Sequence, residues 1–152
     1  MNKLLIWTLL FFYVSFTLVA QDTSTGQSLL DKGTAAQASE FRDSAVYYFK
    51  KAQNFYHEKA NWQKYIEASA GLCRNYMRLD EYGLVEENAM SAFDIHEKYN
   101  LPENDINYLE LLNQMGRINW WIKGDFAKAF EYLHRAKHLA ASLDEPDTMI
   151  RP

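Results

Sequence analysis

The sequence predicts an all-α fold, an α-solenoid of about three antiparallel helix pairs. Helix-breaking residues are rare in the 152-residue chain, with 6 Gly and 3 Pro, whereas 4 Trp, 10 Tyr and 9 Phe supply bulky groups for packing. Apolar residues recur at intervals of three and four, and no alternating apolar run bounded by turn residues predicts a strand. Small residues also recur at a long interval, which favours repeated helix pairs over a closed bundle.

The first 20 residues form a separate segment. Met1-Asn2-Lys3 is a short positive start, and no charged residue occurs from Leu4 to Ala20. This pattern predicts a signal peptide that is cleaved after Ala20. A membrane anchor is the alternative, although the 17 uncharged residues span only about 26 Å as a helix. Either interpretation places the remaining chain outside the cytoplasm, in the periplasm or secreted.

Composition excludes several classes of protein. The formal net charge is −4 and no run of basic residues occurs, so the sequence gives no reason to propose a nucleic-acid partner. Cys73 is the only cysteine, and the fold must therefore rely on an apolar core rather than on an internal disulfide. No pattern calls for a cofactor.

The chain after the signal peptide is expected to form one helical domain. We expect a flexible lead-in over residues 21–26, the helical domain over residues 27–142 and a tail over residues 143–152. The first helix covers residues 27–39 and contains Gly33, which weakens it. Asp43-Ser44 supplies side-chain oxygens that can cap the second helix.

Four further helices follow. Asn61 is expected to cap the third, the fourth ends near Asn100 before Pro102, and Gly124-Asp125 separates the fifth from the sixth. Each has one apolar face. In the fourth helix this face contains Val85, Ala89, Ala92, Phe93 and His96. The fifth helix runs to about residue 122 and is expected to bury Leu109, Leu112, Gly116 and Trp120. The apolar residues that the sixth helix carries at this spacing are Phe126, Ala129, Leu133, Ala136 and Ala140.

The second helix of each pair repeats a pattern of small residues. Ala52, Ala92 and Ala136 occupy the same place in it, at intervals of 40 and 44 residues. The strongest stretch covers residues 112–132, with Leu-Asn-x-x-Gly, two tryptophans and then Gly-Asp-Phe. It resembles the tetratricopeptide repeat (TPR) family, whose usual period is about 34 residues. One extra residue lies between Gly116 and Gly124, which leaves the register of the fifth helix open by one position.

The signal peptide, the long repeats and the phrase from Asn61 to Ile66 resemble the N-terminal repeats of exported Bacteroidetes-type TPR proteins. The resemblance implies a non-catalytic scaffold that binds a protein or peptide. The alternative that it implies is a sensory or regulatory module of a larger protease-like (CHAT) or signalling protein. No helix with a polar outer face follows Ser142, so we expect a partner or further chain to cover the last helix.

Members of this family usually bind extended peptides or helices along the concave face made by the first helix of each pair. On this resemblance, six residues are expected to face the partner: Arg74, Met77, Arg78, Asn113, Arg117 and Trp121. Arginine and tryptophan often carry interface energy, and two arginines can hold a carboxylate. The alternative is that the arginines are ordinary surface charges and that a tryptophan packs between helices. A membrane is a partner only if the N-terminal segment is retained.

Three side chains have a weaker claim to chemistry. His134 and His138 are four residues apart on one helix, with Glu131 three residues before, but no further ligand converges on them. Cys73 lies where the repeat wants a small buried residue, and buried thiols are inert. His96 belongs to an apolar face. We therefore expect no catalytic site and no metal site.

Overall fold

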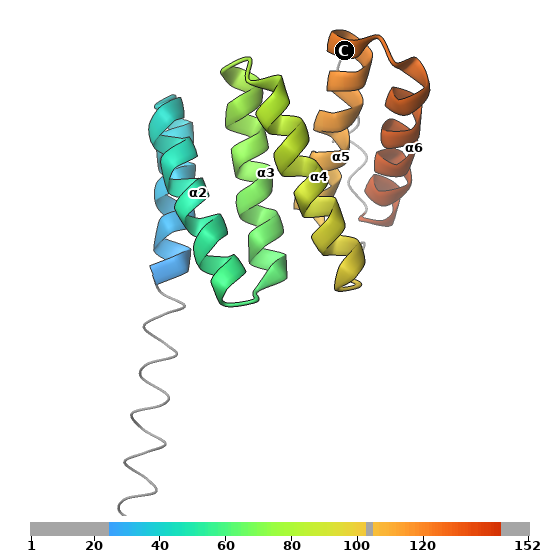
Figure 1. Cartoon of the computed structure of the whole chain (residues 1–152). Helices are drawn as coiled ribbons and strands as arrows, with labels where there is room; N and C mark the ends of the chain where they lie inside the picture. Colours follow the sequence, from blue (N-terminus) through green and yellow to red (C-terminus); the bar gives the residue numbers. More distant parts are fainter. Residues whose placement is uncertain (1–24, 103–104, 144–152) are drawn as a thin grey trace, which may run out of the picture.

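The computed structural model describes residues 25–102 and 105–143, and these residues form six helices and no strand. The helices stand side by side, with α6 at the end of the row opposite the first helix, and successive helices run in opposite directions (Figure 1). Their bounds are 25–38 for the first helix, α2 Arg42–Glu58, α3 Trp62–Arg78, α4 Tyr82–Lys98, α5 Ile106–Arg117 with its extension η1 Ile118–Lys123, and α6 Phe126–Ser142. The all-α prediction is confirmed.

Three of the predicted segments lie wholly or largely outside the described residues. The predicted signal peptide, the first four residues of the lead-in and residues 144–152 of the tail all fall there. Residues 25 and 26 of the predicted lead-in are already helical. At Gly26 the helix lies so close to Phe55 and Tyr56 that their rings leave no room for a Cβ. In the described part of the chain, no helix is long and apolar enough to cross a bilayer.

The helices divide into two sets by their packing. We call the first helix, α3 and α5 the odd helices, and α2, α4 and α6 the even helices. α3 packs against α2, α4 and α5, and α5 also packs against α4 and α6. The first helix touches α3 through Gln37, which accepts a hydrogen bond from Asn75. Each odd helix therefore contacts the next odd helix as well as its even partner.

Four left-handed residues follow the first four helices at intervals of 20 residues. They are Glu40, Ala60, Asp80 and Asn100, all with positive φ. After each of them the next residue donates its backbone N–H to the carbonyl five residues earlier, at 2.9–3.0 Å, which closes the helix in a Schellman arrangement. Because one helix and its turn take 20 residues, a pair takes 40. This is the interval from Ala52 to Ala92.

The even helices bury the same positions. α2 buries Ala45, Phe49, Ala52 and Tyr56, and 40 residues later α4 buries Val85, Ala89, Ala92 and His96. α6 repeats three of these positions after a further 44 residues with Ala129, Ala136 and Ala140. The predicted inward faces of α4 and α6 are thus confirmed at their small residues. Small side chains allow the close approach of helices that bulky ones would prevent.

Phe49 shows why glycines lie inside two odd helices. A Cβ on Gly33 of the first helix would come within 2.9 Å of the Phe49 ring, and one on Gly71 of α3 would come within 2.6 Å. The Phe49 ring of α2 is therefore held between the first helix and α3, each of which has a glycine at the contact. Gly33, which weakens the first helix locally, is required by this packing.

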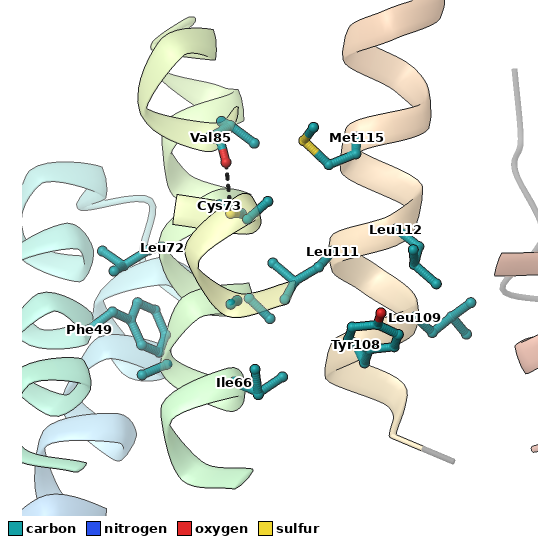
Figure 2. Packing of buried hydrophobic residues seen from close by; sticks show 14 of the residues in the cluster. Phe49, Ile66, Leu72, Cys73, Val85, Tyr108, Leu109, Leu111, Leu112 and Met115 are labelled. Atoms are coloured by element: carbon teal, nitrogen blue, oxygen red, sulfur yellow. Dashed lines mark hydrogen bonds between the residues drawn. The ribbon is translucent and has the colours of Figure 1, made fainter. Parts of the chain in front are cut away.

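The packing between α3, α4 and α5 is visible in Figure 2. Leu111 and Met115 of α5 point toward α3 and α4, whereas Leu109 and Leu112 point to the opposite side of α5 (Figure 2). All four side chains are at most 2% exposed. Because α5 is apolar on two sides, it can pack against α3 and α6 at once.

Two predicted helix starts have different outcomes. Asn61 caps α3 as predicted, since its side chain accepts a hydrogen bond from the backbone N–H of Lys64 at 3.2 Å. The prediction for Asp43-Ser44 is wrong, because α2 already begins at Arg42, and Phe41 before it makes no side-chain cap. The preceding turn keeps the 20-residue spacing of the other turns and has no capping side chain.

The extra residue of the fifth helix lies in η1, a π-helical turn. Gly124 replaces the left-handed residues of the earlier turns, and Asp125 donates its N–H to the carbonyl of Asn119 six residues earlier instead of five. The wider turn buries Asn119 and leaves Trp120 44% exposed. The prediction that Trp120 faces inward is therefore wrong. Phe126 is also exposed rather than buried, at 59%.

Candidate functional site

A chain of polar side chains crosses all three odd helices. The Oε1 atom of Gln37 in the first helix accepts hydrogen bonds from Asn75 Nδ2 at 2.9 Å and from Arg74 Nη1 at 3.5 Å, both in α3. Arg74 continues to Glu110 of α5, and Gln114 Nε2 donates to Glu110 Oε1 at 3.3 Å. These five residues form what we call the odd-helix network.

The pair Arg74–Glu110 is the charged centre of the odd-helix network. Arg74 Nε donates to Glu110 Oε1 at 2.9 Å, and a terminal nitrogen of Arg74 donates to Glu110 Oε2 at 2.6 Å, which is the bidentate geometry of a strong pair. The hydrogen bond to Glu110 raises the pKa of Arg74, although partial burial acts in the opposite direction. The carboxylate that Arg74 holds is therefore internal, and a partner's carboxylate must displace Glu110 to reach it.

Two acceptor oxygens of the network have no donor among the residues that the structure describes. They are Asn75 Oδ1 and Gln114 Oε1, on side chains that are 0% and 7% exposed. An unsatisfied buried acceptor costs roughly 1–3 kcal/mol. Because both orphan groups are oxygens, the group that would satisfy them must carry N–H or O–H donors.

The six predicted site residues have different environments. Arg74 is part of the network, Met77 is partly buried against the core, and Asn113 is half-buried. Arg78 and Arg117 are exposed, and neither forms an ion pair with another described residue. A third exposed residue is Trp121, at 68%. The structure thus places Arg74 in the odd-helix network and leaves Arg78, Arg117 and Trp121 on the surface.

The sequence reasoning missed four members of the odd-helix network: Gln37, Asn75, Glu110 and Gln114. A signal for two of them was present, because Asn75 and Gln114 interrupt apolar faces. Asn75 lies between Cys73 and Tyr76, and Gln114 lies between Leu112 and Met115. An amide on a buried face requires hydrogen-bond partners, so its position can mark a polar site.

Cys73 is buried at the contact of α3 with α4. Its thiol donates to the carbonyl of Val85 at 3.5 Å (Figure 2) and accepts from Asn88 Nδ2 at 3.1 Å. Burial raises the pKa of Cys73 to about 12, while the hydrogen bond from Asn88 acts in the opposite direction. The thiolate that nucleophilic chemistry requires is therefore not formed at neutral pH, as expected for a structural cysteine.

His96 packs in the core, whereas His134 and His138 lie on the surface. His96 is 8% exposed and stacks on Tyr108 with ring centroids 3.8 Å apart, so it is buried on the apolar face of α4 to which the sequence assigns it. His134 and His138 are exposed, with their Nε2 atoms 3.2 Å apart. No group of three His, Cys, Asp or Glu side chains that could hold a metal ion occurs among the residues placed by the structure.

Comparison with protein-family models, with curated proteins and with solved structures found no match to this chain.

Proposed function

We propose that the chain is a non-catalytic TPR-type scaffold that binds a polypeptide along the face of its odd helices. The support for repeats is the 20-residue interval between left-handed residues and the recurrence of buried positions in the even helices. On this proposal the first helix with α2, α3 with α4, and α5 with α6 are three repeats of an α-solenoid. Arg74, Met77, Arg78 and Asn113 lie along or beside the binding face.

The odd-helix network is the observation that carries the proposed binding. It spans three helices, as an extended ligand would, and it offers two acceptor oxygens without donors. A polypeptide supplies N–H donors at regular intervals along its main chain. Because both acceptors are buried, we propose that Asn75 and Gln114 turn toward the bound chain to meet these donors, which relieves the cost of two unsatisfied acceptors and favours the complex.

A non-catalytic role is supported by the state of the one cysteine. The pKa of Cys73, about 12, excludes it as a nucleophile near neutral pH. We also propose that the protein acts outside the cytoplasm, because residues 1–20 have the charge and apolar pattern of a signal peptide. Mass spectrometry of the protein expressed with its own N-terminus tests this directly, and a mature chain that begins at Gln21 is expected. An unprocessed chain found in the cytosol would contradict it.

The binding proposal is tested with Gln114→Met, which removes an orphan oxygen at nearly constant volume. Displayed random peptides are first selected on the full chain, and affinities are then measured by fluorescence anisotropy. Gln114→Met removes the unsatisfied acceptor and also the hydrogen bond that Gln114 donates to Glu110, so the free energy of unfolding is expected to change by less than about 1 kcal/mol. It is also expected to weaken the selected peptides by about tenfold, because their donors lose an acceptor.

The control is Tyr47→Ala, which removes an aromatic ring that is 52% exposed on the even helix α2. It is expected to leave peptide affinity unchanged within about twofold. Peptides that bind Gln114→Met as tightly as the unaltered chain, or that lose affinity with Tyr47→Ala instead, would refute binding on the odd helices. Failure to select any peptide would refute the proposed function itself.

A further inference from the structure

The last helix pair presents aromatic side chains at the end of the helix row. Trp121, Phe126 and Phe130 are 68%, 59% and 68% exposed. Trp120 joins them, since its ring lies 5.1 Å from that of Phe126 and 6.4 Å from that of Trp121. We call the following residues the end surface: Arg117, Trp120, Trp121, Phe126, Phe130 and Lys137.

Arg117 has the same place in its helix as Arg74. Each follows directly a small buried residue of an odd helix, Cys73 in α3 and Gly116 in α5. In α3, this arginine reaches forward to the next odd helix, where it forms the bidentate pair with Glu110. Arg117 is thus the arginine that would hold a carboxylate of a following odd helix, and no described residue pairs with it.

Trp121 occupies a second forward-facing position. It lies three residues before the left-handed Gly124, just as Gln37 lies three residues before the left-handed Glu40. Gln37 makes the contact of the first helix with α3, through Asn75. The corresponding residue of the last odd helix is a tryptophan, so the contact that it offers is apolar.

The even helix α6 repeats this relationship. In α4, Glu86 reaches forward to Lys123 at 2.5 Å, and Phe93 packs its ring 5.4 Å from that of Tyr108, so both residues contact the segment of α5 and η1. The corresponding residues of α6, 44 positions later, are Phe130 and Lys137. Both helices of the last pair, α5 and α6, therefore have exposed side chains at the positions by which α3 and α4 contact α5.

From this repetition we infer that the end surface docks an amphipathic α-helix of another polypeptide, with its apolar side on Trp121 and Phe130 and a carboxylate at Arg117. The charge of the surface defines this partner as acidic. The two charged residues of the end surface, Arg117 and Lys137, are both positive. A second copy docking through the same surface would oppose these positive charges to each other, which disfavours it.

The geometry of the contact follows a common recognition mode. An amphipathic helix that lies against a groove or helix pair presents anchors at intervals of three and four residues. Exposed aromatic rings and arginine are the residue types that carry most energy in such interfaces. This inference does not depend on the proposed binding along the odd helices, because Gln114 and Asn75 take no part in the end surface.

Two synthetic amphipathic peptides of about five helical turns test the inference. Both have the same leucine face, and one carries glutamate and the other lysine on its flanks. Binding to the full chain is measured by fluorescence anisotropy. The glutamate peptide is expected to bind at least about tenfold more tightly than the lysine peptide, and Arg117→Glu is expected to reverse this preference. Equal binding of both peptides, or a preference that Arg117→Glu leaves unchanged, overturns the inference.

The apolar part is tested with Phe130→Ala and with Phe41→Ala as a matched control. Phe41 is equally exposed, at 67% against 68%, but lies before α2. Phe130→Ala is expected to weaken the glutamate peptide by about tenfold, and Phe41→Ala by less than about twofold. Equal effects overturn the inference. Light scattering tests whether a second copy of the chain occupies the end surface, and removal of residues 144–152 tests whether the tail does. Dimers that Phe130→Ala dissociates, or an affinity for the glutamate peptide that rises about tenfold when residues 144–152 are removed, would also overturn the inference.

Discussion

Leu133 of α6 fills the space that a side chain on Gly116 of α5 would need. A Cβ built on Gly116 would lie 2.6 Å from Leu133 Cγ, closer than carbon atoms approach unless the leucine side chain or one of the two helices shifts. The same relationship holds between Gly33 and Phe49 in the first pair. A glycine of each outer odd helix thus receives the bulky residue of its even partner.

Gly116→Ala is accordingly expected to lower the free energy of unfolding by about 1–3 kcal/mol, because the added methyl overpacks the contact. Urea denaturation measures this. Leu133→Ala is destabilising by itself, but it makes room for the methyl. The double variant is therefore expected to be more stable than the sum of the two single effects predicts. Strict additivity would show that the contact between Gly116 and Leu133 is not close.

Gly83 offers a matched control for Gly116→Ala. A Cβ on Gly83 meets nothing within 4 Å, and the residue lies in the first turn of α4. Gly83→Ala is expected to raise the free energy of unfolding by roughly 0.5 kcal/mol, because alanine loses less backbone entropy in a helix. A loss of stability at both glycines would indicate that alanine is unfavourable for a reason other than packing.

Ala60 carries a positive φ of 51° in the turn between α2 and α3. This left-handed conformation costs an alanine about 1 kcal/mol relative to glycine. Ala60→Gly is therefore expected to raise the thermal midpoint, with a gain of roughly 0.5 kcal/mol after the greater entropy of glycine in the unfolded chain is subtracted. Ala127→Gly, on the exposed side of α6, is expected to lower it. A lower midpoint for Ala60→Gly would contradict the left-handed assignment.

Much of the fold could be predicted from the sequence because it depends on local patterns. The 40-residue interval from Ala52 to Ala92 results from two 17-residue helices and their turns, and it is visible as a repetition of small residues. The apolar stripe of α4 at Val85, Ala89 and Ala92 is likewise a local periodicity. Tertiary packing did not override these signals.

The candidate site could be predicted only in part, because it depends on contacts between distant helices. Arg74 was identifiable as an arginine on an odd helix, but its partner Glu110 lies 36 residues away and no local pattern connects them. The outward turn of Trp120 also escaped prediction. A single extra residue between Gly116 and Gly124 can be absorbed at several places, and only packing selects the π-turn.

Deletion of Ile122 tests the role of that extra residue. It restores the interval of seven positions from the small residue to the left-handed residue, as from Cys73 to Asp80, so η1 can close as an α-helix. The deletion variant is expected to unfold cooperatively, with stability within about 1 kcal/mol of the unaltered chain. Deletion of the equally exposed Tyr47 from α2 is expected to unfold the chain, because it moves Phe49 and Ala52 out of register. Equal damage from both deletions would contradict this account of η1.

Cys73 is expected to make stability depend on pH in the alkaline range. Its pKa is about 12 in the folded protein against 9.0 for an ordinary thiol, so the folded state keeps a proton that the unfolded state loses. Its contribution to stability is fully present below pH 9 and is lost as pH rises from 9 toward 12, at up to about 1.4 kcal/mol per pH unit.

The test compares the unaltered chain with Cys73→Ala by urea denaturation between pH 8 and about 10.5, a range that begins below this window and extends into it. Tyr56, whose pKa burial also raises, remains in both proteins and cancels. Tyr76 does not cancel completely, because Cys73 adds to the effect of burial in raising its pKa, so the measured difference includes this interaction. The difference in unfolding free energy between the two proteins should shrink as pH rises, and a constant difference would show that the thiol is not buried as described.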